Sequence, residues 1–334
     1  MRALLDSERV RIDSWLTAED EHSLGRDVLA GLTRPFKELP PKHFYDARGS
    51  DLFERITELD EYYPTRTELE ILRSRADEIV ELTGAGELVE LGSGASLKAR
   101  ILLDAMQRAG TLTRYVPLDV SEAVIREAAD GLVHDYEALT VHGVVGDFER
   151  HLDKLPQPLQ TPRLVALLGG TIGNFKPDAR RALLAKIAVL LRDGDTFLLG
   201  TDLVKDRGVL EAAYNDSDGV TAEFNRNVLH VINGRLGADF VPDDFEHVAF
   251  FDTEQEWIDI RLRATRDAVV VIPDLDLTVE FAAGEEMRTE VSAKFTPARV
   301  RDDLAAAGLE LVAWLTDPDE MFALSLARLP SGAA

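Results

Sequence analysis

The stretch that decides the fold reads Glu87-Leu-Val-Glu-Leu-Gly-Ser-Gly-Ala-Ser-Leu-Lys-Ala-Arg100. Residues 88–91 are typical of a short buried β-strand, the glycines that follow predict a tight turn, and residues 99–106 favour an α-helix. A strand that leads through a glycine turn into a helix is how α/β sheets hold nucleotide-like ligands. However, Leu97 stands where the dinucleotide-binding fingerprint has its third glycine. The turn alone is therefore weak evidence, since a plain strand–helix connection explains it equally well.

Length and composition limit the class of protein. The chain has 334 residues, 45% of them hydrophobic, which indicates a globular protein of two domains or of one large domain with an insertion. It has 37 basic and 61 acidic residues, and the net charge of −24 argues against nucleic acid and anionic membrane surfaces as partners. The absence of cysteine excludes disulfides, thiolate metal sites and cysteine nucleophiles. The seven histidines lack metal-binding spacing, so we expect no metal.

The sequence also gives an expectation for location. No apolar run reaches transmembrane length, and the first residues are acidic where a signal peptide would be basic and apolar. We therefore expect a cytoplasmic protein. The sequence does not determine the oligomeric state, and a monomer is the working expectation.

Beyond the glycine turn, predicted strands alternate with predicted helices. The strands are expected at 115–120, 140–145, 163–168 and 196–201, and the helices at 122–133 and 178–191. Glycine or a polar residue follows each strand: Gly92, Asp119, Asp147, Asn174 and Asp202. The carboxyl ends of parallel strands meet at one edge of the sheet, where ligands bind. Each acid alone could be a helix cap or a loop charge, but several strand ends marked in this way predict a ligand site.

The segments before the glycine turn are predicted to be helices and aromatic turns. We expect helices at 23–32 and 51–59, ordered aromatic turns at 42–50 and 61–66, and a helix from Thr67 to Gly84 that begins with a capping box of Thr67 and Glu70. Tyrosines in such turns are more often packing residues than ligand contacts. Two aromatic turns ahead of one ligand motif nevertheless favour a lid over the site.

The pattern after residue 202 predicts a second, inserted α+β domain. It contains a helix at 220–231 and strands at 239–240, 245–248, 256–263 and 275–281. A helix at 296–307 and an antiparallel hairpin of 311–316 with 321–326 then close the chain. A Rossmann-like α/β sheet with this closing hairpin is typical of class I S-adenosylmethionine (SAM) methyltransferases. We expect 67–202 with 295–330 to form the SAM-binding domain, and 20–66 with 203–294 to form a discontinuous substrate-binding domain.

Several longer motifs give a closer resemblance. They lie at 41–53, 61–68, 89–94, 146–148, 169–174, 200–206, 224–227, 281–287 and 290–292, and include Pro-Lys-His-Phe-Tyr-Asp-Ala-Arg-Gly-Ser-Asp-Leu-Phe and Gly-Gly-Thr-Ile-Gly-Asn. With them, residues 23–328 resemble the L-histidine Nα-methyltransferases of ergothioneine biosynthesis. The resemblance implies SAM-dependent transfer of three methyl groups to the α-amino nitrogen of L-histidine, which gives hercynine.

The resemblance also implies roles for single residues. Those that would hold SAM are Gly92, Lys98, Asp119, Asp147 and Phe148, with Tyr45 near it. Asp119 would accept hydrogen bonds from the ribose hydroxyls, and Asp147 from the adenine amino group. Those that would contact the substrate are Asn174 and Tyr214 at the carboxylate with Tyr62 nearby, Gly169 and Thr171 at the amino group, and Glu290 and Ser292 at the imidazole.

The residues themselves support the last pair. Alternation along 290–295 places Glu290 and Ser292 on one face of a strand, where a carboxylate and a hydroxyl can pair both nitrogens of an imidazole. Without the resemblance, an exposed polar strand face would explain the pattern better. Two positions depart from the family: Gly170 replaces a frequent serine and Ile260 a methionine found in some relatives, which leaves side-chain selectivity open.

The chemistry requires that a proton leave the amino group, which is mostly an ammonium at neutral pH. No dedicated histidine or lysine base stands among the motif positions. The carbonyl of Gly169 and a water held by Thr171 or Tyr45 are alternative routes for the proton. Three other functions remain open: a NAD-linked oxidoreductase, a non-catalytic SAM-binding module, and methylation of another free amino acid on the same scaffold.

Overall fold

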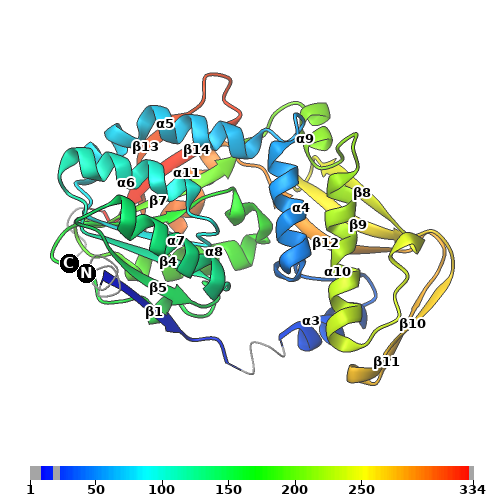
Figure 1. Ribbon diagram of the computed structural model, residues 1–334. Helices are drawn as coiled ribbons and strands as arrows, with labels where there is room; N and C mark the ends of the chain where they lie inside the picture. Colours follow the sequence, from blue (N-terminus) through cyan, green and yellow to red (C-terminus); the bar gives the residue numbers. More distant parts are fainter. Residues whose placement is uncertain (1–8, 18–22, 331–334) are drawn as a thin grey trace.

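The computed structural model describes residues 9–17 and 23–330. Its largest feature is an eight-stranded sheet in the order β1-β5-β4-β3-β6-β7-β14-β13 (Figure 1). The first six strands in this order are parallel, whereas β14 runs antiparallel to both β7 and β13. The strands are β1 (Val10–Ser14), β3 (Glu87–Leu91), β4 (Arg114–Asp119), β5 (Thr140–Val145), β6 (Arg163–Leu167), β7 (Thr196–Asp202), β13 (Glu310–Thr316) and β14 (Phe322–Arg328).

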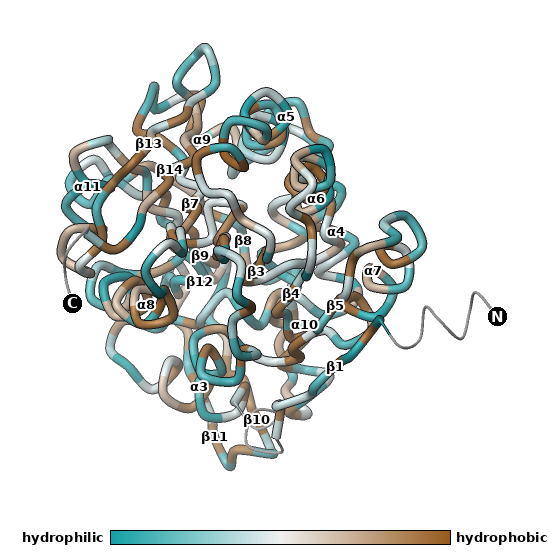
Figure 2. The backbone as a smooth tube through the Cα atoms, turned by 90° about the vertical axis from the view of Figure 1, so that its left-hand side faces the viewer, coloured by the Kyte–Doolittle hydropathy of each residue, from teal (hydrophilic) through white to brown (hydrophobic). Residues whose placement is uncertain are grey.

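Helices cover both faces of this sheet, because its central strands are apolar on both sides. One face packs against α5 (Pro64–Thr83), α6 (Leu97–Ala109) and α7 (Glu122–Asp135), and the other against α8 (Pro177–Leu190) and α11 (Pro297–Ala306). Figure 2 shows hydrophobic stretches at β7 and β14, with helices around them whose outer turns are largely hydrophilic. The sheet therefore separates two hydrophobic cores.

A smaller sheet lies beside the large one, at the right of Figure 1. Its order is β2 (Lys37–Glu38), β12 (Glu286–Ala293), β9 (Trp257–Ala264) and β8 (Phe245–Asp252), and a separate hairpin joins β10 (Ala268–Ile272) to β11 (Leu277–Phe281). The helices packed here are α3 (Ser23–Leu32), α4 (Ala47–Glu58), α9 (Arg207–Ala213) and α10 (Val220–Leu236). Buried residues from 24–63 and from 210–287 form this third hydrophobic core.

A short 3₁₀ turn, Thr171–Asn174, joins the two sheets where it packs against β12. A Cβ atom on Gly173 would lie 2.8 Å from the backbone oxygen of Ala293, so only glycine permits this approach. An ion pair between Lys176 and Glu38 also crosses between the two parts. The carboxyl edge of the large sheet thus faces one strand of the small one.

Most expected elements are confirmed, including the alternating strands, the closing hairpin and the Ser121 cap of α7. The capping box at Thr67 is wrong: α5 begins at Pro64, which fits the first helical position, and the Thr67 amide already donates to Tyr63. The loop expected at 42–50 is partly helical, because the Asp46 side chain caps α4. Residues 239–240 form no strand, and β1 was not predicted.

Candidate active site

The glycine turn holds Asp119 in place at the carboxyl edge of the sheet. Gly92 and Gly94 have φ angles of +73° and +48°, which glycine adopts without strain. The Gly94 amide donates to one Asp119 oxygen at 2.9 Å, and the Ser121 amide donates to the other at 3.0 Å. Each carboxylate oxygen retains a lone pair. Half-buried Asp119 can therefore accept further bonds from ligand hydroxyls.

An aromatic side chain forms the next wall of this edge. A Cβ on Gly92 would lie 3.6 Å from the Phe148 ring, which itself lies 6.2 Å from the Phe175 ring, centroid to centroid. The neighbouring Asp147 carboxylate accepts the Glu149 amide at 2.8 Å. Apolar faces beside a carboxylate suit an adenine ring with its amino group.

Glu68 links Lys98 on α6 to the Gly169 backbone, and the sequence did not identify it. Its carboxylate is fully buried in the first turns of α5, lies 2.5 Å from the Lys98 ammonium and accepts the Gly169 amide at 2.9 Å. Its spacing from the buried Ile71 and Leu72 places it on the core face of α5. That spacing was the available signal, since a carboxylate on an apolar helix face must have a partner.

The peptide between Leu168 and Gly169 is held at both ends. Glu68 accepts its N–H, and the Thr171 hydroxyl donates to its carbonyl oxygen at 2.9 Å. A threonine hydroxyl has one proton, so Thr171 Oγ1 presents only lone pairs in any other direction. In this arrangement the Thr171 hydroxyl can accept a hydrogen bond from an amine N–H but cannot donate one to the amine nitrogen.

Lys294 organises the second part of the site. Its side chain is fully buried, and its ammonium lies 2.7 Å from Asp202, 2.9 Å from the Tyr214 hydroxyl and 2.9 Å from the Ser292 hydroxyl. The two hydroxyls lie 2.8 Å apart. Asp202 ends β7, whereas Ser292 belongs to β12, so this cluster ties the two sheets together.

Two further residues hold Asp202. The Tyr63 hydroxyl donates to it at 2.8 Å, and the Lys205 ammonium lies 2.6 Å away. Burial opposes ionisation of Asp202, but the Lys294 and Lys205 ammonium groups outweigh it and keep the pKa of the carboxyl below its usual value. Burial lowers the pKa of Lys205 to about 8, although Asp202 opposes the shift. The cluster thus carries two potential positive charges around one negative charge.

Glu290 faces the same cluster. Burial raises the pKa of its carboxyl to about 7, and the Lys294 charge only partly opposes this shift. The strand alternation expected here is confirmed: Val291 and Ala293 enter the core on the opposite face, while Ser292 contacts Tyr214. Ile260 is the cross-strand partner of Glu290 on β9 and so borders its side chain.

Aromatic side chains form a cluster that extends from Tyr214 through Tyr62 and Phe53 to Tyr45. Tyr62 lies edge-on to Tyr214 at 6.1 Å, and Tyr45 lies edge-on to Phe53 and Phe224. The whole Tyr45 residue is 45% exposed, yet desolvation of its hydroxyl, followed by the Glu290 charge, raises its pKa. A phenol in this position stays protonated throughout the neutral range.

The predicted residues thus form two adjoining groups. Most SAM-binding candidates lie at the ends of β3, β4 and β5, and Lys98 lies at the start of α6. Tyr45 lies apart from these strand ends, before α4, and packs against Phe53 and Phe224. The imidazole and carboxylate candidates lie around β12. Gly169, Thr171 and half-buried Asn174 stand between them on the segment that packs against β12. No interaction between Asn174 and Tyr214 joins their side chains in the described residues.

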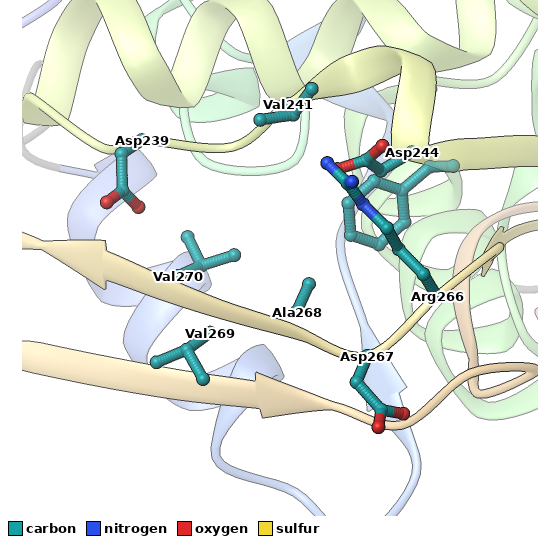
Figure 3. A pocket seen from close by; sticks show the side chains of 9 residues that line it. Asp239, Val241, Asp244, Arg266, Asp267, Ala268, Val269 and Val270 are labelled. Atoms are coloured by element: carbon teal, nitrogen blue, oxygen red, sulfur yellow. The ribbon is translucent and has the colours of Figure 1, made fainter.

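A recess of about 260 Å³ lies elsewhere, beside β10 (Figure 3). Arg266 points to Asp244 and binds it at 2.6 Å, while Asp239 accepts the Val271 amide. Asp267 likewise accepts a backbone amide. These charged side chains of the recess therefore already bind other parts of the chain, and none of the predicted site residues lines the recess.

Within residues 9–17 and 23–330, no group of three histidine, aspartate or glutamate side chains could hold a metal ion. No helix of this part of the chain is long and apolar enough to cross a bilayer.

Comparison with known proteins identifies the family. A model of histidine-specific, SAM-dependent methyltransferases matches residues 24–329. The chain is 54% identical to the histidine N-alpha-methyltransferase of Mycolicibacterium smegmatis, over 94% of this chain and 98% of that protein. It is 50% identical to the enzyme of the same name from Mycobacterium tuberculosis, over 96% and 99%. Ergothioneine biosynthesis protein 1 of Neurospora crassa is 31% identical over 95% of this chain but 35% of its own length. These matches cover nearly the whole chain and show its family: the chain belongs to the histidine-specific, S-adenosylmethionine-dependent methyltransferases.

Proposed function

We propose that this chain transfers three methyl groups from SAM to the α-amino nitrogen of L-histidine and so makes hercynine for ergothioneine biosynthesis. One observation carries the proposal most directly. Glu290 and Ser292 lie side by side on β12 and border Tyr214, in a family whose model is histidine-specific. A carboxylate and a hydroxyl at this spacing complement the two nitrogens of an imidazole.

SAM fits the residues at the carboxyl edge of the large sheet. Gly92 lies against Phe148, and Asp119 retains lone pairs for the ribose hydroxyls. Asp147 would accept from the adenine amino group, and Lys98 would hold the cofactor at the Glu68 side, with Tyr45 as the lid. When bound, SAM supplies a methyl group on a positively charged sulfonium, which is the electrophile of the reaction.

The chain's own task is to position a neutral amine. Asn174 and Tyr214 would bind the substrate carboxylate beside Tyr62, which fixes the amino group near Gly169 and Thr171. Because the Thr171 hydroxyl proton is donated to Leu168, its oxygen is free to accept an amine N–H. We propose that Thr171 accepts an amine N–H and so orients the nitrogen, and that the departing proton passes to water, guided by the Gly169 carbonyl or by a water held at Thr171 or Tyr45.

The two parts of the chain would divide these tasks. We propose that 67–202 with 295–330 bind SAM, and that 20–66 with 203–294 bind histidine, where 20–22 lie outside the described residues. The support is that one hydrophobic core is built almost wholly from the second set. The cytoplasmic location and the monomeric state stay predictions.

Product analysis tests the function. The chain is incubated with SAM and, separately, histidine, tryptophan, tyrosine or leucine, and products are identified by mass spectrometry. We expect mono-, di- and trimethylhistidine, in succession, and little product from the other amino acids. Preferential methylation of another amino acid would overturn the proposed substrate, and absence of any SAM-dependent product would overturn the activity.

Glu290→Ala is the matched variant for substrate recognition. A site that hydrogen-bonds its substrate can reject analogues that lack the bond by about 10⁴-fold. We expect a sharp loss of activity on histidine. The difference in activity between histidine and apolar amino acids should become smaller, and SAM affinity should not change. An unaltered preference for histidine would mean that the imidazole is recognised elsewhere.

A further inference from the structure

The Lys294 ammonium group directs its three N–H donors at three buried or partly buried side chains. An ammonium group has three donors and no acceptor. Here they meet Asp202 at 2.7 Å and the hydroxyls of Tyr214 and Ser292 at 2.9 Å each. Burial lowers the pKa of this lysine, and the charge of Asp202 opposes that shift and favours the ammonium form. Lys294 therefore occupies one lone pair on each hydroxyl oxygen and holds the two oxygens together.

The hydroxyl pair then has a fixed hydrogen-bond count. Tyr214 and Ser292 lie 2.8 Å apart, so one of them donates to the other. Each brings a single proton, and one of the two protons lies between the oxygens. Only one proton remains for a ligand. The two hydroxyls must face the pocket with opposite polarity, one as donor and the other as acceptor.

We propose that the substrate carboxylate sets this polarity, so that Ser292 accepts an N–H from the histidine ring. This inference rests on the proposed function. A carboxylate only accepts, so Tyr214 must donate to it. Ser292 then gives its proton to Tyr214 and presents a lone pair to the ring. Lys294 acts as a positioning residue that makes recognition of the two ends of the substrate interdependent.

Glu290 would face the second nitrogen of the histidine ring. An ionised carboxylate also only accepts, so two acceptors would face a neutral ring that has one N–H. Either the ring takes up a second proton or Glu290 does. The ring and Glu290 together must therefore hold one more proton in the complex than they hold apart in mildly alkaline solution.

The surroundings of Glu290 make its carboxylate, and not the histidine ring, the group that takes up the additional proton. The titratable groups that interact electrostatically with Glu290 are Tyr45, Tyr62, Tyr214 and Lys294. Burial raises the pKa of all three phenols, so they keep their protons. Burial also brings the pKa of Glu290 to about 7, so retaining a proton there costs little near neutral pH.

Calorimetry of hercynine binding measures the number of protons taken up by the complex. Hercynine is suitable because its trimethylammonium group cannot gain or lose a proton. Binding is measured at pH 8 in two buffers of different protonation enthalpy, which gives the number of protons taken up. At this pH the free imidazole is neutral, since its ordinary pKa is about 6.5. We expect wild-type protein to take up about one proton per bound hercynine.

Tyr214→Phe is the decisive variant. Without the phenol hydroxyl, Ser292 keeps its own proton and can donate it to the ring, while the ring N–H donates to ionised Glu290. Proton uptake should fall close to zero, even if binding weakens. Asn174→Ala is the matched control, because it removes the other proposed carboxylate contact but leaves the hydroxyl pair intact. It should bind hercynine more weakly with uptake still about one.

The outcomes separate the inference from the function. Hercynine binding without proton uptake in the wild type would overturn the inference and leave the proposed substrate standing. Equal uptake in the wild type and Tyr214→Phe would overturn it as well. No hercynine binding at all, together with no methylation of histidine, would overturn the proposed function itself. Nitrogen-15 NMR of the labelled ring gives a second readout: with the added proton on Glu290, the bound ring should stay neutral and carry its single N–H on the nitrogen that faces Ser292.

Discussion

Replacing Glu68 by glutamine is the sharpest test of how the two halves of the site are connected. The Glu68 carboxylate is fully buried, binds the Lys98 ammonium at 2.5 Å and accepts the Gly169 amide at 2.9 Å. Glutamine has the same shape and can still accept from Gly169. Its amide nitrogen is a donor, however, and cannot pair with Lys98. The variant therefore removes one contact and keeps the other.

The lost contact sets the size of the effect. A hydrogen bond to a charged group contributes about 1.5–3 kcal/mol to stability. The Lys98 side chain is 20% exposed, so water partly replaces the missing partner and the lower value applies. If Glu68 prepares Lys98 for the cofactor, about 1.5 kcal/mol corresponds to roughly tenfold weaker SAM binding. The rate of methyl transfer should also fall, because Gly169 loses a charged anchor.

The assay combines calorimetric SAM titration, kcat and KM for histidine, and thermal melting. Glu87→Gln is the matched control. Glu87 is also fully buried and paired, with Arg163 at 2.9 Å, but it lies at the opposite end of β3. We expect it to lower stability without changing SAM affinity. Gly200→Ala is an independent perturbation, since its Cβ would lie 2.2 Å from a Glu68 oxygen and must displace it.

Two results would refute this reasoning. Unchanged SAM affinity in Glu68→Gln, with a loss of stability matching that of Glu87→Gln, would show that Glu68 is only structural. Tighter SAM binding would show that Glu68 competes with the cofactor for Lys98 instead of preparing it.

Three further predictions concern single side chains. Asp119→Ala should weaken SAM binding about tenfold to a hundredfold, the equivalent of a charge-assisted bond, and unchanged affinity in a calorimetric titration would contradict its ribose role. Asn174→Ala should weaken histidine binding much more than SAM binding, and the reverse order in the same assay would show that its role is misplaced. Glu290→Gln should alter the pH dependence of stability, because the wild-type pKa is raised from 4.5 to about 7. Between these values the folded wild type binds more protons than the unfolded chain, so it should lose up to about 3 kcal/mol relative to the variant as the pH rises from 4 to 8. Parallel stability curves from denaturant titrations would contradict that shift.

The sequence predicted the large sheet because its signals are local. Apolar strands alternate with amphipathic helices, and glycine or polar residues mark the strand ends, so residues such as Gly92 and Asp119 could be placed at one edge without coordinates. The hairpin of β13 and β14 was equally visible, since two apolar runs flank a short polar turn. The strand β1 was not visible, because its sequence gains strand structure only by pairing with β5.

The candidate site divides in the same way. Motifs placed Glu290 and Ser292 on one strand face, since alternation along a strand is a property of the sequence itself. Glu68 and Lys294 were not identified, because each acquires its role from partners distant in the chain: Gly169 is 101 residues from Glu68, and Tyr214 is 80 residues from Lys294. Burial makes these contacts obligatory, since a charge removed from water must be paired. The sequence alone therefore predicted which groups meet the ligands, whereas only the tertiary structure decided which buried charges hold those groups in position.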